Sequence, residues 1–218
     1  MELDKCIKNR RSIRSYLDKD VSWNLLYKII DAAHYAPSSG NLQNWRFVVV
    51  KDEQKRAKLA RASLNQLWMT EAPVHIVVCS DNRNIKKQYE KDAKKYIKEN
   101  CAAAIQNILL KAYDLGLGTC WVGSFNPILA GDAVEIKDYT EVVGIITLGY
   151  SKEKPISKRH EIQELTYFET YGNLRRISKE FVSKAFPLQK HNKKIEKTIS
   201  KFKTKIKNKF KKEKRLMP

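Results

Sequence analysis

The sequence predicts a layered domain of helices and strands, in the α/β or α+β class. Three short apolar runs rich in β-branched residues are typical of buried strands, at residues 47–50, 74–79 and 142–148. Between them, apolar residues recur at helical spacing. Helices and strands in this alternation bury their apolar faces against one another in layers.

Three helices are predicted in the first part of the chain. The first presents a short apolar face formed by Leu3, Cys6 and Ile7. Ser22 is a typical N-cap for the second, which should end before Pro37 because the residue preceding a proline disfavours helical geometry. Its apolar stripe consists of Leu25, Leu26, Ile29, Ile30 and Ala33. A third helix is expected from Glu53 to about Asn65.

Two more helices and a short strand are predicted before the last strand. Residues 84–99 are charged and helical in pattern, and residues 101–115 form an apolar helix rich in small side chains. Gly116 is the expected C-cap of that helix. Residues 119–125 then predict a short strand that runs into a loop.

The charge of the chain is unevenly distributed. The 218 residues carry a formal charge of +19, which favours a polyanionic partner: nucleic acid, a membrane surface or a phosphate ligand. Residues 172–218 hold 17 Lys and Arg against 3 Asp and Glu, and so contribute +14. We therefore predict a globular body over residues 1–171 and a basic extension over residues 172–218.

The composition excludes several classes of protein. A hydrophobic content of 42% is too high for a wholly disordered chain. No apolar run reaches the roughly 18 residues that a membrane span needs, and the first ten residues lack the apolar core of a secretory signal. We therefore expect a soluble protein of the cytoplasm.

The basic extension predicts an amphipathic helix. Its apolar residues follow one helical stripe, made of Ile195, Ile199, Phe202, Ile206 and Phe210. Such a segment could be a solvated lysine-rich extension, lie on an anionic membrane or pack on a partner subunit. Nucleic acid is the less favoured partner, because no recognition motif and too few aromatic side chains accompany the charge.

The cysteines and histidines predict no metal site. Cys6, Cys79, Cys101 and Cys120 form no CxxC pair, and the four histidines are scattered along the chain. In a cytoplasmic chain we expect four reduced and mostly buried thiols.

Three polar loops interrupt the scaffold. Arg10, Arg11, Ser12 and Arg14 place four donors within five residues, which suits a phosphate clasp, although a solvated basic turn has the same pattern. Residues 37–43 carry short hydroxyl and amide side chains beside Gly40, which would let the backbone approach a planar polar ligand. Residues 116–124 are glycine-rich, but they contain neither the GxGxxG spacing nor a P-loop.

Together, these loops resemble the nitroreductase family of flavin enzymes. The resemblance rests on RRSIR, APSSGNLQNW, LGLGTCWVGSF and VVGIITLGYSKEKP, and it spans about residues 2–170. It implies a three-layer α+β fold with a central, mainly antiparallel sheet flanked by helices. It further implies an intertwined homodimer that binds FMN at its interface, with helix 101–115 in the dimer core or simply buried within one chain.

The resemblance also implies roles for single residues. Arg10, Arg11, Ser12 and Arg14 match the motif that holds the FMN phosphate and ribityl chain. A second loop, typically from the other subunit, lies along the isoalloxazine ring and is matched here by Pro37, Ser38, Ser39 and Asn41. Asn65 matches a side chain that bonds the pyrimidine edge of the ring. Gly123 and Ser124 match the pair beside the flavin N5 atom, and Lys158 and Arg159 match late basic residues at the phosphate.

The chemistry implied is a hydride transfer from NAD(P)H to the flavin N5 atom, followed by electron transfer to a small acceptor such as a nitroaromatic, a quinone or a flavin. No side-chain acid or base is predicted. The sequence departs from the family pattern at Asn44, Ser124 and His160, of which only Ser124 affects the geometry beside N5. The alternative is a binding protein in which the flavin fold is a scaffold and the basic extension contacts an anionic membrane or nucleic acid.

Overall fold

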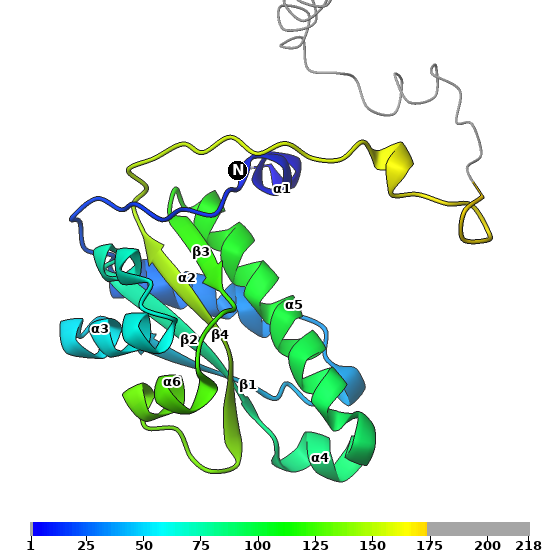
Figure 1. The fold of residues 1–218 in the computed structure, drawn as a ribbon, viewed down its shortest axis with the longest axis horizontal. Helices are drawn as coiled ribbons and strands as arrows, with labels where there is room; N and C mark the ends of the chain where they lie inside the picture. Colours follow the sequence, from blue (N-terminus) through cyan, green and yellow to red (C-terminus); the bar gives the residue numbers. More distant parts are fainter. Residues whose placement is uncertain (1, 174–218) are drawn as a thin grey trace, which may run out of the picture. The chain divides into compact units, whose positions relative to one another are not determined.

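The computed structural model describes residues 2–173 (Figure 1). The chain divides into two compact units, residues 1–157 and 158–218, and each is described by itself. The described part of the second unit contains a short 3-10 turn, η4 (Ile162–Glu164). The stripe predicted from Ile195 to Phe210 lies outside the described residues, and the boundary near Gly172 stays a prediction.

The first unit is built on one antiparallel sheet. Its strands are β1 (Trp45–Val50), β2 (Val74–Asp81), β3 (Gly118–Val122) and β4 (Thr140–Gly149), in the order β1-β2-β4-β3. All four predicted strands are therefore confirmed. β2 and β4 occupy the centre, which explains why their apolar residues run almost without interruption: both faces of these strands are covered.

One face of the sheet is covered by α2 (Trp23–His34) and α5 (Ala93–Asp114). Because side chains alternate along a strand, Ile76 of β2 and Ile146 of β4 point to this side, where they join the buried stripes of both helices. The helical residues fully buried in this core include Leu26, Ile29, Ile105 and Ile108. The short helix α1 (Leu3–Asn9) packs against α5.

The opposite face is covered by α3 (Glu53–Ala62) and α6 (Pro127–Val134). Val77 of β2 and Ile145 of β4 point to this side and form a second core with Leu59 of α3. The molecule thus has a helix–sheet–helix arrangement, and the predicted three-layer α+β class is confirmed (Figure 1).

The prediction of one charged helix over residues 84–99 is wrong. The chain forms α4 (Arg83–Tyr89), then a 3-10 turn, η3 (Glu90–Asp92), and α5 begins at Ala93. Glu90 has φ = 41°, outside the helical region, so it ends α4. The break lets α5 pack on the sheet and bury Ile97 and Cys101. The charge pattern of the sequence alone does not reveal this tertiary packing.

α6 is not among the predicted helices, although its start carries a recognisable signal. The side chain of Asn126 accepts hydrogen bonds from the amides of Ile128 and Leu129, and Pro127 occupies the first turn. Two predicted helix ends are confirmed. The Ser22 hydroxyl accepts a bond from the Leu25 amide at 3.4 Å, and Gly116 follows α5 with φ = 78°.

All four cysteines are buried free thiols, as expected. Among residues 2–173, no helix is both long enough and apolar enough to cross a membrane. The same part of the chain holds no cluster of three or more His, Cys, Asp or Glu side chains that could bind a metal ion.

Candidate functional site

Residues Arg10–Arg14, here called the cationic loop, run beside the start of β3. The chain is extended rather than helical at this point, and Ser12 forms a parallel bridge with Thr119. The amide of Ile13 donates to the Thr119 carbonyl at 2.9 Å. The loop is thus fixed to the sheet through its backbone.

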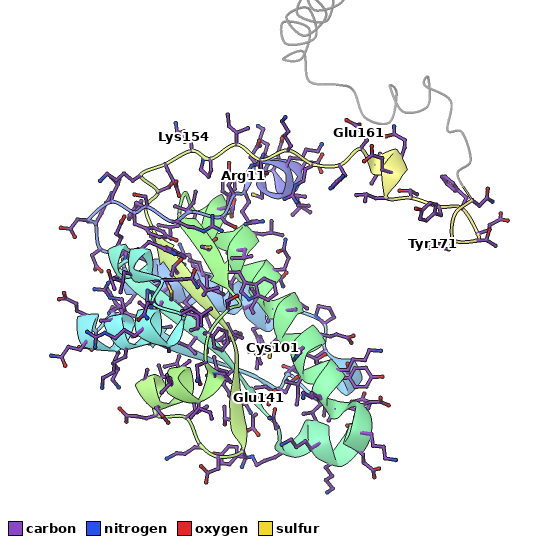
Figure 2. The ribbon with its side chains drawn as sticks, in the orientation of Figure 1. Arg11, Cys101, Glu141, Lys154, Glu161 and Tyr171 are labelled. Atoms are coloured by element: carbon purple, nitrogen blue, oxygen red, sulfur yellow. The ribbon has the colours of Figure 1, made fainter. Side chains whose placement is uncertain are left out.

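A cavity of about 400 Å³ opens beside the cationic loop. Its walls come from the loop, from the end of α5 and from the segment after β4, and include Arg10, Arg11, Tyr113, Thr119, Glu153 and Lys154. In Figure 2, Arg11 and Lys154 lie at the same end of the first unit, remote from Glu141 at the other end of β4. The buried hydroxyl of Thr119 has no hydrogen-bond partner in residues 2–173. Guanidinium, ammonium and hydroxyl donors fit a phosphate group.

The side chains of the cationic loop have distinct neighbours. Arg11 donates from Nη1 to the carbonyls of Lys8 at 2.7 Å and Arg10 at 2.8 Å, at the C-terminal end of α1. The Arg14 guanidinium lies 5.9 Å from the ring centroid of Trp68. Burial raises the pKa of the Cys120 thiol, and the opposing influences are Arg14, a hydrogen bond with Ser12 and Arg10. Of the predicted phosphate ligands, Arg10 and Arg11 line the cavity, whereas Ser12 and Arg14 lie close to the Cys120 thiol and are not part of the cavity wall.

A second group of predicted residues lies where β3 ends. Gly123 and Ser124 follow the strand, and the side chain of Gln66 donates from Nε2 to the Ser124 carbonyl at 3.4 Å. Asn65 precedes Gln66 and adopts φ = 56°, in the turn between α3 and the 3-10 helix η2 (Leu67–Glu71). The structure thus brings Asn65, Gly123 and Ser124 together, and Gln66 is a contact that the sequence did not predict.

Gly123 offers open backbone at this end of the strand. A methyl group added at its Cα would meet no atom within 4 Å. β3 separates this backbone from the cationic loop by about 13 to 16 Å, since a strand rises roughly 3.3 Å per residue. An elongated ligand with an anionic end and a planar end, such as FMN, therefore fits the two groups of residues.

The loop Pro37–Gln43 is held by α5. It contains the 3-10 turn η1 (Ser39–Asn41), and Asn100 accepts hydrogen bonds on Oδ1 from the Ser39 amide at 2.9 Å and the Ser39 hydroxyl at 3.1 Å. The Ser38 hydroxyl accepts a bond from the Gln43 amide at 3.0 Å. Asn41 adopts a positive φ of 54°. Pro37, Ser38, Ser39 and Asn41 thus form a tightly bonded unit.

Within one chain, the loop Pro37–Gln43 does not meet the cationic loop. It is bonded to Asn100, whereas Tyr113, near the C-terminal end of α5, lines the cavity of the cationic loop. A helix rises about 1.5 Å per residue, so the 13 residues from Asn100 to Tyr113 span about 20 Å. The two loops therefore lie at separate points along α5.

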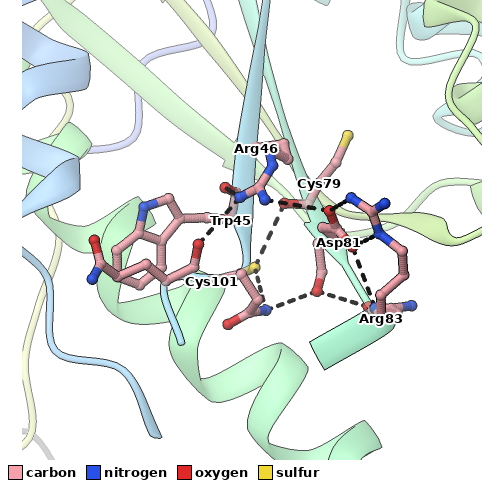
Figure 3. A network of polar contacts seen from close by, with 10 residues as sticks. Trp45, Arg46, Cys79, Asp81, Arg83 and Cys101 are labelled. Carbon is pink, nitrogen blue, oxygen red and sulfur yellow. Dashed lines mark hydrogen bonds and ion pairs between the residues drawn. The ribbon is translucent and has the colours of Figure 1, made fainter. Parts of the chain in front are cut away.

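A network of polar side chains at the sheet lies next to the loop Pro37–Gln43 (Figure 3). Asp81 receives bonds on Oδ2 from Arg83 at 2.7 Å and Arg46 at 3.3 Å, and these guanidinium groups, Arg83 first, lower its carboxyl pKa. Beneath it, the buried Asn44 donates to the Ser80 hydroxyl at 2.7 Å and accepts from Asn100 at 2.7 Å. The sequence alone does not predict a role for Asn44 or Asn100. Its one relevant signal is that Asn44, before Trp45, departs from the family pattern.

Lys158 and Arg159 are the first residues of the second unit. Their predicted contact with the phosphate therefore stays a prediction.

Comparisons with known proteins agree with the sequence resemblance. The model of the nitroreductase family matches residues 7–69 and 61–150, more than half of the chain. A protein of Archaeoglobus fulgidus, provisionally named NADH dehydrogenase/NAD(P)H nitroreductase, is 34% identical over 159 residues, 70% of this chain and 88% of its own length. The FMN reductase (NAD(P)H) of Bacillus subtilis is 29% identical over 189 residues, 79% of this chain and 75% of its own.

Solved structures show the same architecture. An FMN-dependent nitroreductase of Clostridium difficile superposes with a TM-score of 0.67 at 28% identity, over 77% of this chain and 99% of that one. NfrA2 of B. megaterium has a TM-score of 0.73 at 24% identity, over 84% of this chain and 80% of its own, a likeness that concerns the fold alone.

Proposed function

The chain belongs to the nitroreductase family of oxidoreductases, and we propose that it uses FMN to pass electrons from NAD(P)H to a small organic acceptor such as a nitroaromatic, a quinone or a flavin. The observation that carries this proposal is the pairing of cationic side chains at one end of β3 with open backbone at Gly123 at the other. Fold alone would not support it, because one fold serves many reactions.

The residues have separate tasks in this proposal. Arg10, Arg11, Ser12 and Arg14 neutralise and hold the phosphate and the adjoining ribityl chain, and Lys158 and Arg159 add positive charge. Asn65 bonds the pyrimidine edge of the ring. The backbone at Gly123 and Ser124 lies against the reactive part of the ring, with the Ser124 carbonyl fixed by Gln66.

When bound, FMN would supply the two-electron redox chemistry between NAD(P)H and the acceptor. The protein has to compensate the charge that develops on the ring, and prepositioned donors in a site closed to water do this most effectively. We assign no side-chain acid or base to this reaction.

We further propose that the active form is a homodimer, in which Pro37, Ser38, Ser39 and Asn41 of one subunit cover the ring held by the other. The separation of about 20 Å between the two loops along α5 supports this arrangement. We also propose the cytoplasm as the location of the protein.

The decisive test of the function is spectroscopic. We expect the purified protein to be yellow, to release FMN on denaturation, and to lose its flavin absorbance when NADH or NADPH is added without oxygen. A colourless protein that takes up no FMN would overturn the proposal. Acceptors are then compared under the same conditions to identify the physiological class.

Subunit mixing tests the shared site. One variant combines Arg10→Ala with Arg14→Ala, and the other combines Ser39→Ala with Asn41→Ala. Each alone should bind little FMN, whereas a dimer with one subunit of each kind has one intact site. Random mixing should therefore restore about a quarter of all sites. No recovery on mixing, from variants that still form dimers, would place both loops in one chain.

A further inference from the structure

Two carboxylates hold the backbone at the end of the cationic loop. Glu153 accepts hydrogen bonds on Oε1 from the amides of Arg14 at 2.5 Å and Ser15 at 3.2 Å. Glu71 accepts on Oε2 from the Tyr16 amide at 3.2 Å and the Ser15 hydroxyl at 3.1 Å. Three successive amides thus point at two carboxylates that come from distant parts of the chain.

The position of Glu153 is itself fixed. The Ser151 hydroxyl donates to the Glu153 carbonyl at 2.6 Å and accepts from the Glu153 amide at 3.2 Å. Ser151 also pairs with Tyr16 in an antiparallel bridge, and the Lys152 amide donates to the Ser15 carbonyl at 3.0 Å. The segment after β4 is therefore bonded to the chain after the cationic loop through its backbone, in addition to the bond between the Glu153 carboxylate and the Arg14 amide.

This arrangement conflicts with a purely electrostatic view of the site. Glu153 lines the same cavity as Arg10 and Arg11, where a negative charge repels a bound phosphate. Its carboxylate, however, is engaged by two backbone amides, and a charged acceptor makes such bonds short and strong. Its useful effect is then on geometry, because these two bonds hold the backbone of Arg14 and Ser15 at the end of the cationic loop.

We propose that Glu153, with Glu71 as its partner, is a positioning residue that sets the cationic loop for the phosphate of the flavin. This inference rests on the proposed function. Simple electrostatics predicts that removal of the Glu153 charge relieves repulsion and tightens FMN binding. Our inference predicts the opposite, because loss of the Glu153 hydrogen bonds misplaces the arginines and weakens FMN binding.

The test compares FMN with riboflavin, which lacks the phosphate, by fluorescence titration of flavin-free protein. Glu153→Ala should weaken FMN at least about tenfold and change riboflavin less than about twofold. Glu153→Gln retains an amide oxygen that can accept both bonds, so it should stay within about threefold of the wild type for FMN. Glu71→Ala should weaken FMN in the same selective way, but less.

Asp132→Asn is the matched control, because it removes one negative charge from α6, outside the cavity and the loop. It should leave both affinities unchanged. A Glu153→Ala protein that melts like the wild type yet binds FMN as tightly, or more tightly, would overturn the inference. So would equal losses for FMN and riboflavin, which indicate general damage to the site. A wild type that binds FMN no better than riboflavin would instead overturn the proposed use of the cationic loop.

Discussion

Asn100 in α5 forms two hydrogen bonds with Ser39: its Oδ1 accepts from the Ser39 amide at 2.9 Å and from the Ser39 hydroxyl at 3.1 Å. The Asn100 amide group then donates to Asn44 at 2.7 Å, so a single buried side chain ties the loop Pro37–Gln43 to both the helix and the sheet. Amide side chains suit this position because they donate and accept at the same time.

Asn100→Ala should therefore lower the free energy of unfolding by about 2–4 kcal/mol, because it leaves buried donors and acceptors unpaired. Urea denaturation measures the change. Asn107→Ala, on the same helix, removes one bond from a half-buried amide to the Ala32 carbonyl at 3.0 Å and should cost only about 1 kcal/mol. Equal losses in the two variants would contradict the special role of Asn100.

His75 should make stability depend on pH. Burial lowers its pKa from 6.5 to about 4, opposed by the bond with the Met69 carbonyl and assisted by the charge of Arg56. Between these two values the unfolded chain binds a proton that the folded chain does not. The free energy of unfolding should thus fall by about 2 kcal/mol from about pH 7 to about pH 5, and further toward pH 4.

The variant His75→Gln isolates this effect, since an amide side chain can still donate to the Met69 carbonyl but does not titrate in this range. Urea denaturation at the two pH values should give a shallower dependence than in the wild type. His34→Gln, an exposed histidine, serves as the control and should keep the full dependence. An unchanged slope in His75→Gln would refute the assignment.

Two glycines should respond differently to the same substitution. An added Cβ at Gly118 would lie 2.9 Å from Ile13 of the cationic loop, so Gly118→Ala should lower the melting temperature and weaken FMN binding. Gly123 has open space at this position, so Gly123→Ala should melt within a degree or two of the wild type. It should nevertheless weaken FMN and riboflavin alike, because the new methyl group occupies the side on which the ring is proposed to lie. Unchanged affinity for both flavins would show that no ring lies there.

Asp81 should matter more than other ion-paired carboxylates. Its side chain is 9% exposed and bonds both Arg46 and Arg83, so Asp81→Asn should cost about 1–2 kcal/mol. Asp20 pairs with Lys51 at 2.6 Å, but its side chain is 70% exposed, and Asp20→Asn should cost less than about 0.5 kcal/mol. Because the pKa of Asp81 is held below 3.8, its contribution is complete above about pH 5 and is lost progressively in stronger acid. Thermal or urea denaturation of both variants at neutral pH tests the ranking.

Local patterns were sufficient for most of the elements. The apolar β-branched runs indicated three of the four strands, and the hydroxyl of Ser22 and the glycine after α5 indicated two helix ends, because these signals act over a few residues. The division of the charged stretch at Glu90 was missed for the opposite reason. Its cause is the docking of α5 on the sheet, which involves residues far away in the sequence.

The sequence by itself determined a layered fold of helices and strands through its periodicity. Its short motifs, by their resemblance to the nitroreductase family, determined the family, the three-layer α+β class and the cationic residues of the candidate site. Only the tertiary structure decided that Ser12 lies on Thr119, that Glu71 and Glu153 hold the loop between them, and that Asn100 keeps the second loop about 20 Å away along α5. These relationships join segments separated by 55 to 139 residues, and they form only when the sheet and both helix layers pack around a common core.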